Sequence, residues 1–152
     1  MRSLTRTNVT ALLFGLGLSF ALGSQRAAAE TPSCTDWTLR GSYVIETSGS
    51  VTPDGVTFLP IVEVGVVTLD GRGQATGSDT LSFAGNVSSR QLTATYSVNR
   101  DCTFTVAIVI DGDVVNPLHF TGVILGNGAS TSLVQTDPGA TIAVRSRRLG
   151  LL

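Results

Sequence analysis

The stretch YSVNRDCTFTVAIVIDGD, residues 96–113, decides the fold of this chain of 152 residues. It consists of runs of β-branched and aromatic residues that end in two turn signals, Asn-Arg-Asp and Asp-Gly-Asp, a pattern typical of antiparallel hairpins. A loop at the first turn pairs Tyr96 with Phe104, and a loop at the second pairs Phe104 with Phe120. Three neighbouring strands are therefore predicted to share one apolar face.

Turn signals recur on both sides of this stretch, between further β-rich runs, and no segment after residue 30 has a helical period. The pattern predicts strands near residues 39–47, 60–69, 74–83, 90–98, 102–110, 114–125, 130–136 and 140–148. Sequential antiparallel strands with one apolar face each bury those faces without free edges when they close into a barrel. The predicted fold is therefore all-β, an eight-stranded antiparallel up-and-down barrel, with a two-sheet β-sandwich as the alternative.

The hairpin around DGRG places an acid on the apolar face. A two-residue turn at Gly71–Arg72 pairs Val62 with Leu81. The same register sets Asp79 opposite Val64, so a carboxylate is predicted to lie among inward-facing apolar side chains.

The last hairpin, at Asp137–Ala140, places an amide on the same face. Its Asp-Pro-Gly-Ala sequence fits a type II turn, because proline pre-sets φ at the second position and glycine accepts a positive φ at the third. The turn pairs Leu133 with Val144. It also pairs Gln135 with Ile142, so the side chain of Gln135 is predicted to point inward.

The first 29 residues have the order of a secretory signal peptide. Two arginines precede an apolar run at residues 9–23, and small residues then lead to a cleavage site after Ala29. The run is shorter than the ~20 residues of a usual membrane span, so a secreted or periplasmic protein is predicted, with an uncleaved anchor as the alternative. Residues 30–152 then form a single β-barrel domain with no further membrane span.

Charge and composition exclude several classes of function. Once the arginines of residues 1–29 are removed, acids outnumber arginines, so no nucleic-acid partner is predicted. The basic run Arg145–Arg148 is interpreted as a solvated strand end. The chain has no lysine and one histidine, which excludes Schiff-base chemistry and any site built from two histidines. No cofactor and no metal are predicted.

The two cysteines, Cys34 and Cys102, are predicted to form a disulfide, because an even cysteine count in an exported chain indicates pairing. Free buried thiols are the alternative. A redox or nucleophilic role would need a neighbouring activating group, and the sequence offers none clearly.

His119 lies beside Phe120 in the predicted register and therefore faces outward, as a surface histidine. Asp111–Asp113 and Asp70–Gly71 lack the further oxygen ligands of a calcium loop and are interpreted as turn formers. Asn86 begins a glycosylation sequon, which is interpreted as incidental. No nucleophile-elbow pattern is present, so no catalytic residue is assigned.

The motifs TLDGRGQATG (68–77), YSVNRDCTFTV (96–106) and QTDPGA (135–140) resemble those of small exported bacterial proteins of uncharacterised function. That group is in turn similar to bacterial relatives of the allene oxide cyclase barrel, a calycin-like fold of eight strands. The resemblance covers most of residues 30–152. Its motifs are turns and strands, so it implies a fold more than an activity.

Tyr43, Asp79, Tyr96 and Gln135 are the candidate ligand-binding residues, because converging polar groups in an apolar barrel are typical of a small-molecule site. The alternative is that they bond one another in a filled core. The preferred function is a non-enzymatic barrel that binds a small apolar molecule. A cyclase or isomerase with an acid or base such as Asp79, and an interaction module that uses its outer face, are the alternatives. A cavity of several hundred Å³ would favour the first two.

Overall fold

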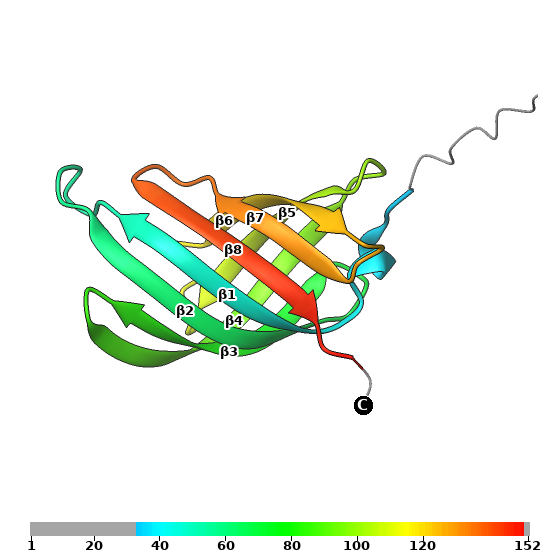
Figure 1. Cartoon of the computed structure of the whole chain (residues 1–152), viewed down its shortest axis with the longest axis horizontal. Coiled ribbons are helices and arrows are strands. Elements are labelled where there is room, and N and C mark those ends of the chain that lie inside the picture. Colours follow the sequence, from blue (N-terminus) through cyan, green and yellow to red (C-terminus); the bar gives the residue numbers. More distant parts are fainter. Residues whose placement is uncertain (1–32, 151–152) are drawn as a thin grey trace, which may run out of the picture. The chain divides into compact units, whose positions relative to one another are not determined.

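A computed structural model describes residues 33–150 of the chain (Figure 1). Each strand pairs antiparallel with the next, and the last pairs with the first, so the sheet closes into a barrel. The strands are β1 (Gly41–Val51), β2 (Leu59–Leu69), β3 (Gln74–Phe83), β4 (Asn86–Val98), β5 (Thr103–Ile110), β6 (Leu118–Leu125), β7 (Ser130–Gln135) and β8 (Ala140–Arg148). The predicted eight-stranded up-and-down barrel is confirmed, and the sandwich alternative is wrong.

Alternation of side chains along each strand separates the interior from the outer surface. In β1, Tyr43, Ile45 and Thr47 are buried, whereas Glu46 and Ser48 between and after them are exposed. The interior is lined mainly by aliphatic and aromatic side chains, and Tyr96, Phe104 and Phe120, which were predicted to share the apolar face, are all buried there. Closure of the barrel therefore follows from strands that each present one apolar face.

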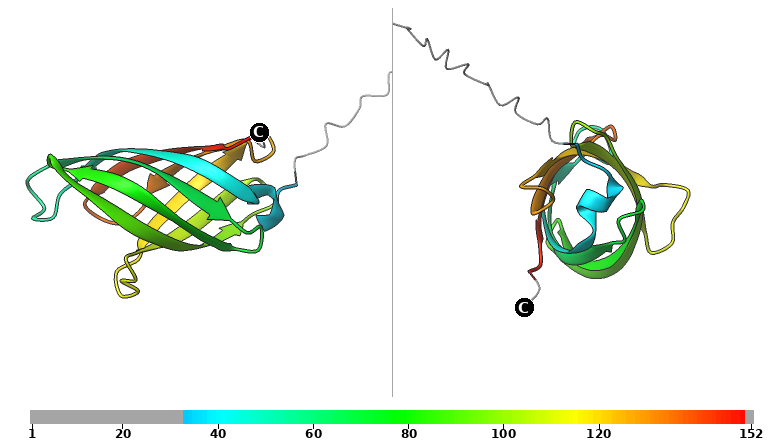
Figure 2. Two further views of the ribbon diagram at one scale, coloured as in Figure 1. Left: turned by 90° about the horizontal axis from the view of Figure 1, so that it is seen from below. Right: turned by 90° about the vertical axis from the view of Figure 1, so that its right-hand side faces the viewer.

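One end of the barrel, here called the plugged end, is covered by a single 3-10 turn, η1 (Asp36–Leu39) (Figure 2). Leu39 has no exposed surface and packs against the core cluster. Arg148 holds the turn in place, because its Nη2 donates a hydrogen bond to the carbonyl oxygen of Thr38 at 2.6 Å. The Asp36 carboxylate accepts from the backbone N–H of Val98 at 2.8 Å.

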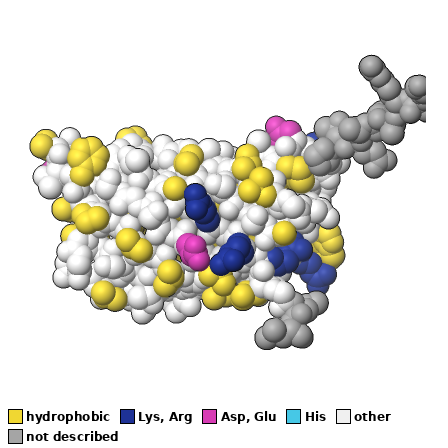
Figure 3. Space-filling model, in the orientation of Figure 1, with side chains coloured by type: hydrophobic (Ala, Val, Ile, Leu, Met, Phe, Trp, Pro, Cys, Tyr) yellow, Lys and Arg dark blue, Asp and Glu magenta, His cyan; other side chains and the backbone are white. Residues whose placement is uncertain are grey.

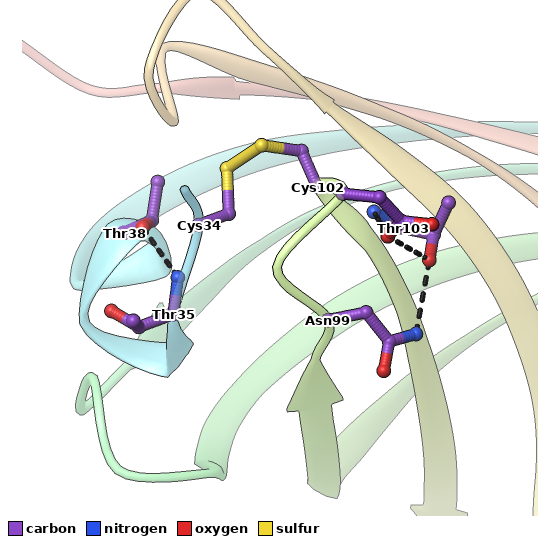
Figure 4. The surroundings of a disulfide bond; sticks show 7 residues. Cys34, Thr35, Thr38, Asn99, Cys102 and Thr103 are labelled. Carbon is purple, nitrogen blue, oxygen red and sulfur yellow. Dashed lines mark hydrogen bonds between the residues drawn. A yellow bond between two sulfur atoms is a disulfide. The ribbon is translucent and has the colours of Figure 1, made fainter. Parts of the chain in front are cut away.

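The predicted disulfide between Cys34 and Cys102 is confirmed (Figure 4). It joins the segment before η1 to the β4–β5 turn, with 5.0 Å between the two Cα atoms. Cys102 has a positive φ of 66°, which closes the turn beside the bond from the Asn99 side chain to Thr103 Oγ1. The disulfide thus fixes η1 over the plugged end.

The registers predicted for the β4–β5 and β5–β6 hairpins are wrong by two residues. Tyr96 lies opposite Val106, and Phe120 also lies opposite Val106, on its other side. The turns are longer than expected, because residues 99–102 and 111–117 lie outside the strands. A shift of two residues keeps every side chain on its predicted face.

The register predicted for the β2–β3 hairpin is wrong by one residue, which reverses the faces of β2. Leu81 pairs with Glu63, not with Val62, and Val62 and Val64 are each 56% exposed on the outer surface. The cause is again the turn, in which all of residues 70–73 are outside the strands. Asp79 still points inward, opposite Gly65.

The predicted pairing of Leu133 with Val144 in the last hairpin is confirmed. Residues 1–29, the predicted signal peptide, lie outside the described residues, and that assignment stays a prediction. Within residues 33–150, no helix is long and apolar enough to cross a membrane.

Candidate functional site: the barrel interior

A cavity of about 120 Å³ lies inside the barrel. Its wall extends from Leu39 at the plugged end to Ile110 and Leu118, which adjoin the β5–β6 loop at the opposite end. The lining is mostly apolar, with a few polar side chains. The volume is smaller than the several hundred Å³ expected for a roomy ligand site, and it resembles instead a cavity that takes a benzene-sized molecule.

All four predicted ligand-binding residues line this cavity: Tyr43, Asp79, Tyr96 and Gln135. They come from four different strands, β1, β3, β4 and β7. Their role in binding stays a prediction. The four residues differ in whether their polar atoms already have hydrogen-bond partners within the protein.

The two tyrosines present their rings to the cavity and their hydroxyl groups to the plugged end. Tyr43 Oη donates to the carbonyl oxygen of Gly128 at 2.7 Å and accepts from Arg148 at 2.8 and 3.0 Å. Tyr96 Oη accepts from the backbone N–H of Gly71 at 2.9 Å, and burial raises the pKa of Tyr96. Both hydroxyl groups are therefore already bonded to backbone atoms of turns, at Gly128 and Gly71, and are not free to bind a ligand.

Asp79 belongs to a charged cluster on the wall formed by β2, β3 and β4. Arg90 Nε donates to Asp79 Oδ1 at 2.9 Å, and Arg90 Nη2 donates both to Asp79 Oδ2 and to Glu63 Oε2, the latter at 2.7 Å. The Asp79 side chain has no exposed surface, and those of Glu63 and Arg90 are 12% and 14% exposed. Thr47 Oγ1 completes the cluster by donating to Glu63 Oε1 at 3.2 Å.

The cluster holds two carboxylates and one guanidinium, so it cannot balance its charge while both acids are ionised. Burial, together with the nearby charge of Asp79, raises the pKa of Glu63 to about 7, although Arg90 acts in the opposite direction. Burial also opposes the charge on Arg90, but its bonds to Asp79 and the charge of Glu63 raise its pKa overall. Glu63 is therefore expected to titrate near neutral pH.

Glu63 and Arg90 were missed by the sequence reasoning. Glu63 was lost because the β2 register was wrong by one residue, which placed Val62 and Val64 inside. Arg90 carried a usable signal, since it lies two residues before the inward-facing Leu92 and must share its face. Gly65, opposite Asp79, leaves room for the Asp79 side chain, because a Cβ at residue 65 would lie 2.8 Å from Asp79 Cβ.

Gln135 contributes to the cavity wall at the end of β7. Its Nε2 donates to Asp137 Oδ2 at 2.8 Å, whereas its Oε1 is buried and has no hydrogen-bond partner within residues 33–150. Buried acceptors in native proteins are nearly always paired, so this atom needs an explanation.

His119 lies on the outer face, as predicted, with its side chain 53% exposed. Its Nδ1 lies 2.8 Å from Asp137 Oδ1, beside a shallow outer groove that Thr105, Thr121 and Thr136 help to line. In the part of the chain that the structure describes, no group of three or more His, Cys, Asp or Glu side chains is placed to hold a metal ion.

The acids suspected of calcium binding act in their turns, as predicted. The Asp70 carboxylate accepts from the backbone N–H groups of Arg72 and Gln74, which lower its pKa. Asp113 accepts from the Asn116 side chain and the Val115 N–H, which lower its pKa in the same way.

Comparison with models of protein families, with curated proteins and with solved structures found no match to this chain. The resemblance to the allene oxide cyclase barrel group therefore stays a prediction.

Proposed function

We propose that this protein binds a small, mainly apolar molecule inside its barrel. The observation that carries the proposal is the cavity of about 120 Å³ with a largely apolar lining. Protein interiors are usually packed to crystal density, so a void of this size leaves many contacts unmade. An apolar molecule of about the size of benzene would recover those contacts.

Titration with toluene tests this function, with binding followed by the NMR shifts of methyl groups that line the cavity, such as those of Val106 and Leu133. Ala94 lines the cavity, so Ala94→Leu places three more carbon atoms in that space and should abolish binding. Ala143 is exposed on the outer face of β8, and Ala143→Leu is the matched control that should bind as the unmodified protein does. Equal binding by both variants would contradict the proposal.

The charged cluster favours a second candidate function, acid or base catalysis on a flexible apolar substrate. A carboxyl group with a pKa of about 7 in an apolar cavity is suited to proton transfer at neutral pH, and Glu63 has these properties. Asp79, the acid named from the sequence, has both carboxylate oxygens bonded to Arg90 and is less free to act. The cyclase suggested by the family resemblance would belong to this class.

Glu63→Gln separates binding from catalysis. An allene oxide, the substrate that the resemblance implies, would be cyclised by the unmodified protein and not by the variant, while toluene would bind to both. If the unmodified protein leaves the allene oxide to its spontaneous decay, the cyclase candidate fails and the binding function is unaffected.

The outer surface gives less support to an interaction module. Val62, Val64 and Val66 form an exposed stripe along β2. On the face drawn in Figure 3, however, the hydrophobic side chains are scattered among polar ones and the basic side chains gather toward the plugged end. Scattered surface hydrophobic residues are normal and do not indicate a partner.

We also propose that the protein acts outside the cytoplasm. The disulfide between Cys34 and Cys102 supports this location, because such bonds persist in oxidising compartments. Fractionation of the cells tests it, with the intact mass of the alkylated protein measured in each fraction. Protein confined to the cytoplasm, with two alkylated cysteines without prior reduction, would contradict it.

A further inference from the structure

We infer that the ligand of the barrel carries a hydrogen-bond donor, a hydroxyl or an amine, on an otherwise apolar body, and that Gln135 Oε1 accepts this hydrogen bond. The inference rests on the proposed function, because it names the class of molecule that the same cavity takes.

The orientation of the Gln135 amide is fixed by Asp137. Burial opposes ionisation of Asp137, but hydrogen bonds from the backbone and ring of His119 and from Gln135 together lower its pKa. An ionised carboxylate only accepts hydrogen bonds, so the amide nitrogen must be the atom that faces it, at 2.8 Å. The amide oxygen is consequently directed away from Asp137.

That oxygen is buried and unpaired among the residues that the structure describes, while Gln135 itself lines the cavity. Leaving a buried acceptor without a donor is costly. A trapped water would need roughly two to four polar partners, and the cavity wall is mostly apolar. A donor group on a bound apolar molecule satisfies the oxygen and fills the space at the same time.

The charged cluster on the other wall argues against an anionic ligand. Glu63 and Asp79 are both acids, and Arg90, the cation that would receive a carboxylate, already donates to both of them. A ligand carboxylate would therefore have to compete with Asp79 and Glu63 for a guanidinium that is already bonded to both. A neutral or cationic donor meets acceptors on both walls.

Phenol, toluene and benzoate form a probe set that tests this assignment, because phenol and toluene differ only by hydroxyl in place of methyl. Dissociation constants would be measured at pH 7 by NMR titration. Gln135→Met keeps the length of the side chain and removes the amide, so it should lower the ratio of phenol affinity to toluene affinity about tenfold. Benzoate should bind at least about tenfold more weakly than phenol.

Gln91→Met is the matched control, since Gln91 is exposed on the outer face of β4, and it should leave the ratio unchanged. Asp137→Ala is a second variant for the case that Gln135→Met does not fold. It releases the amide nitrogen, so the phenol preference should fall while toluene binding stays constant.

The outcomes separate the two proposals. If toluene binds and the phenol-to-toluene ratio is the same with and without the Gln135 amide, the donor assignment is wrong and the binding function stands. Tighter binding of benzoate than of phenol would also overturn the assignment, in favour of an anion on Arg90. If neither phenol nor toluene binds, both proposals are wrong.

Discussion

At the plugged end of the barrel, η1 and the Cys34–Cys102 bond cover the interior, whereas at the opposite end the strands run into two loops of mostly exposed residues, 52–58 and 111–117 (Figure 2). We call the second the loop end. At the plugged end, the side chains of Arg148, Tyr43 and Tyr96 each form a hydrogen bond with a backbone atom outside their own strand. The loop end has exposed apolar side chains such as Phe58, 69% exposed, and Val115, 80% exposed.

This difference assigns separate tasks to the two ends. The plugged end supplies stability, because hydrogen bonds and the disulfide hold η1 in place and Leu39 is fully buried, although Trp37 of η1 is 56% exposed. We expect the loop end to be the more mobile of the two, because loops of mostly exposed residues can move without breaking the core. Changes at the plugged end should therefore alter unfolding, and changes at the loop end should alter it little.

The largest effect is expected from removing the disulfide. The bond spans a sequence separation of 68 residues, and the double change Cys34→Ser with Cys102→Ser should lower the free energy of unfolding by about 4 kcal/mol. Urea unfolding of both proteins measures the difference. A loss below about 1 kcal/mol would show that the plugged end does not carry the stability assigned to it.

Phe104→Ala should lower the free energy of unfolding by about 3 kcal/mol, because Phe104 is 3% exposed and lies in the core near the plugged end. Ile110→Ala should lower the free energy of unfolding by about 1 to 2 kcal/mol, because Ile110 lies beside the loop end and is only partly buried. His119→Ala, on the outer face, should cost less than about 1 kcal/mol. Equal costs for Phe104 and His119 would contradict the inward placement of β5.

The charged cluster between the two ends should make stability depend on pH. The pKa of Glu63 is raised from 4.5 to about 7 by folding, so the folded state holds this proton more tightly than the unfolded chain does. The stabilisation is present below pH 4.5 and is lost as the pH rises through 7. Between pH 5 and 8 the unfolding free energy should fall by about 2 to 3 kcal/mol more than in Glu63→Gln. Parallel pH curves for the two proteins would contradict the burial of this acid.

The smallest effect is expected at the loop end. Phe58→Ser should change the free energy of unfolding by less than about 0.5 kcal/mol, because the side chain makes little buried contact. The same urea experiment measures it. A cost as large as that of Ile110→Ala would mean that Phe58 packs onto the barrel and that the loop end is closed as well.

The strand number and the barrel could be predicted from the sequence because period-two alternation and turn signals are local features. The registers of the β2–β3, β4–β5 and β5–β6 hairpins could not, because they depend on turn lengths that single residues decide, whereas the register of the last hairpin was predicted correctly. The two-residue error at β4–β5 left Tyr96 and Phe104 inside, but the one-residue error at β2–β3 hid Glu63. Gln135 was placed correctly because its turn has a defined type.

The sequence therefore predicted four polar side chains of the lining, Tyr43, Asp79, Tyr96 and Gln135, and not the pairing of Asp79 with Arg90. Asp79 was recognised as an inward acid, but the need for a cation beside it was not used to find Arg90. A buried charge requires a partner, so searching the same wall for an inward-facing arginine would have identified the cluster.

A crystal pressurised with xenon would show whether the barrel contains an unfilled apolar space that small molecules enter. Xenon binds in dry apolar cavities of this size. We expect an ordered xenon atom inside the barrel, among side chains such as Val106 and Leu133. An interior without xenon, filled by side chains or by a chain of ordered waters, would contradict it.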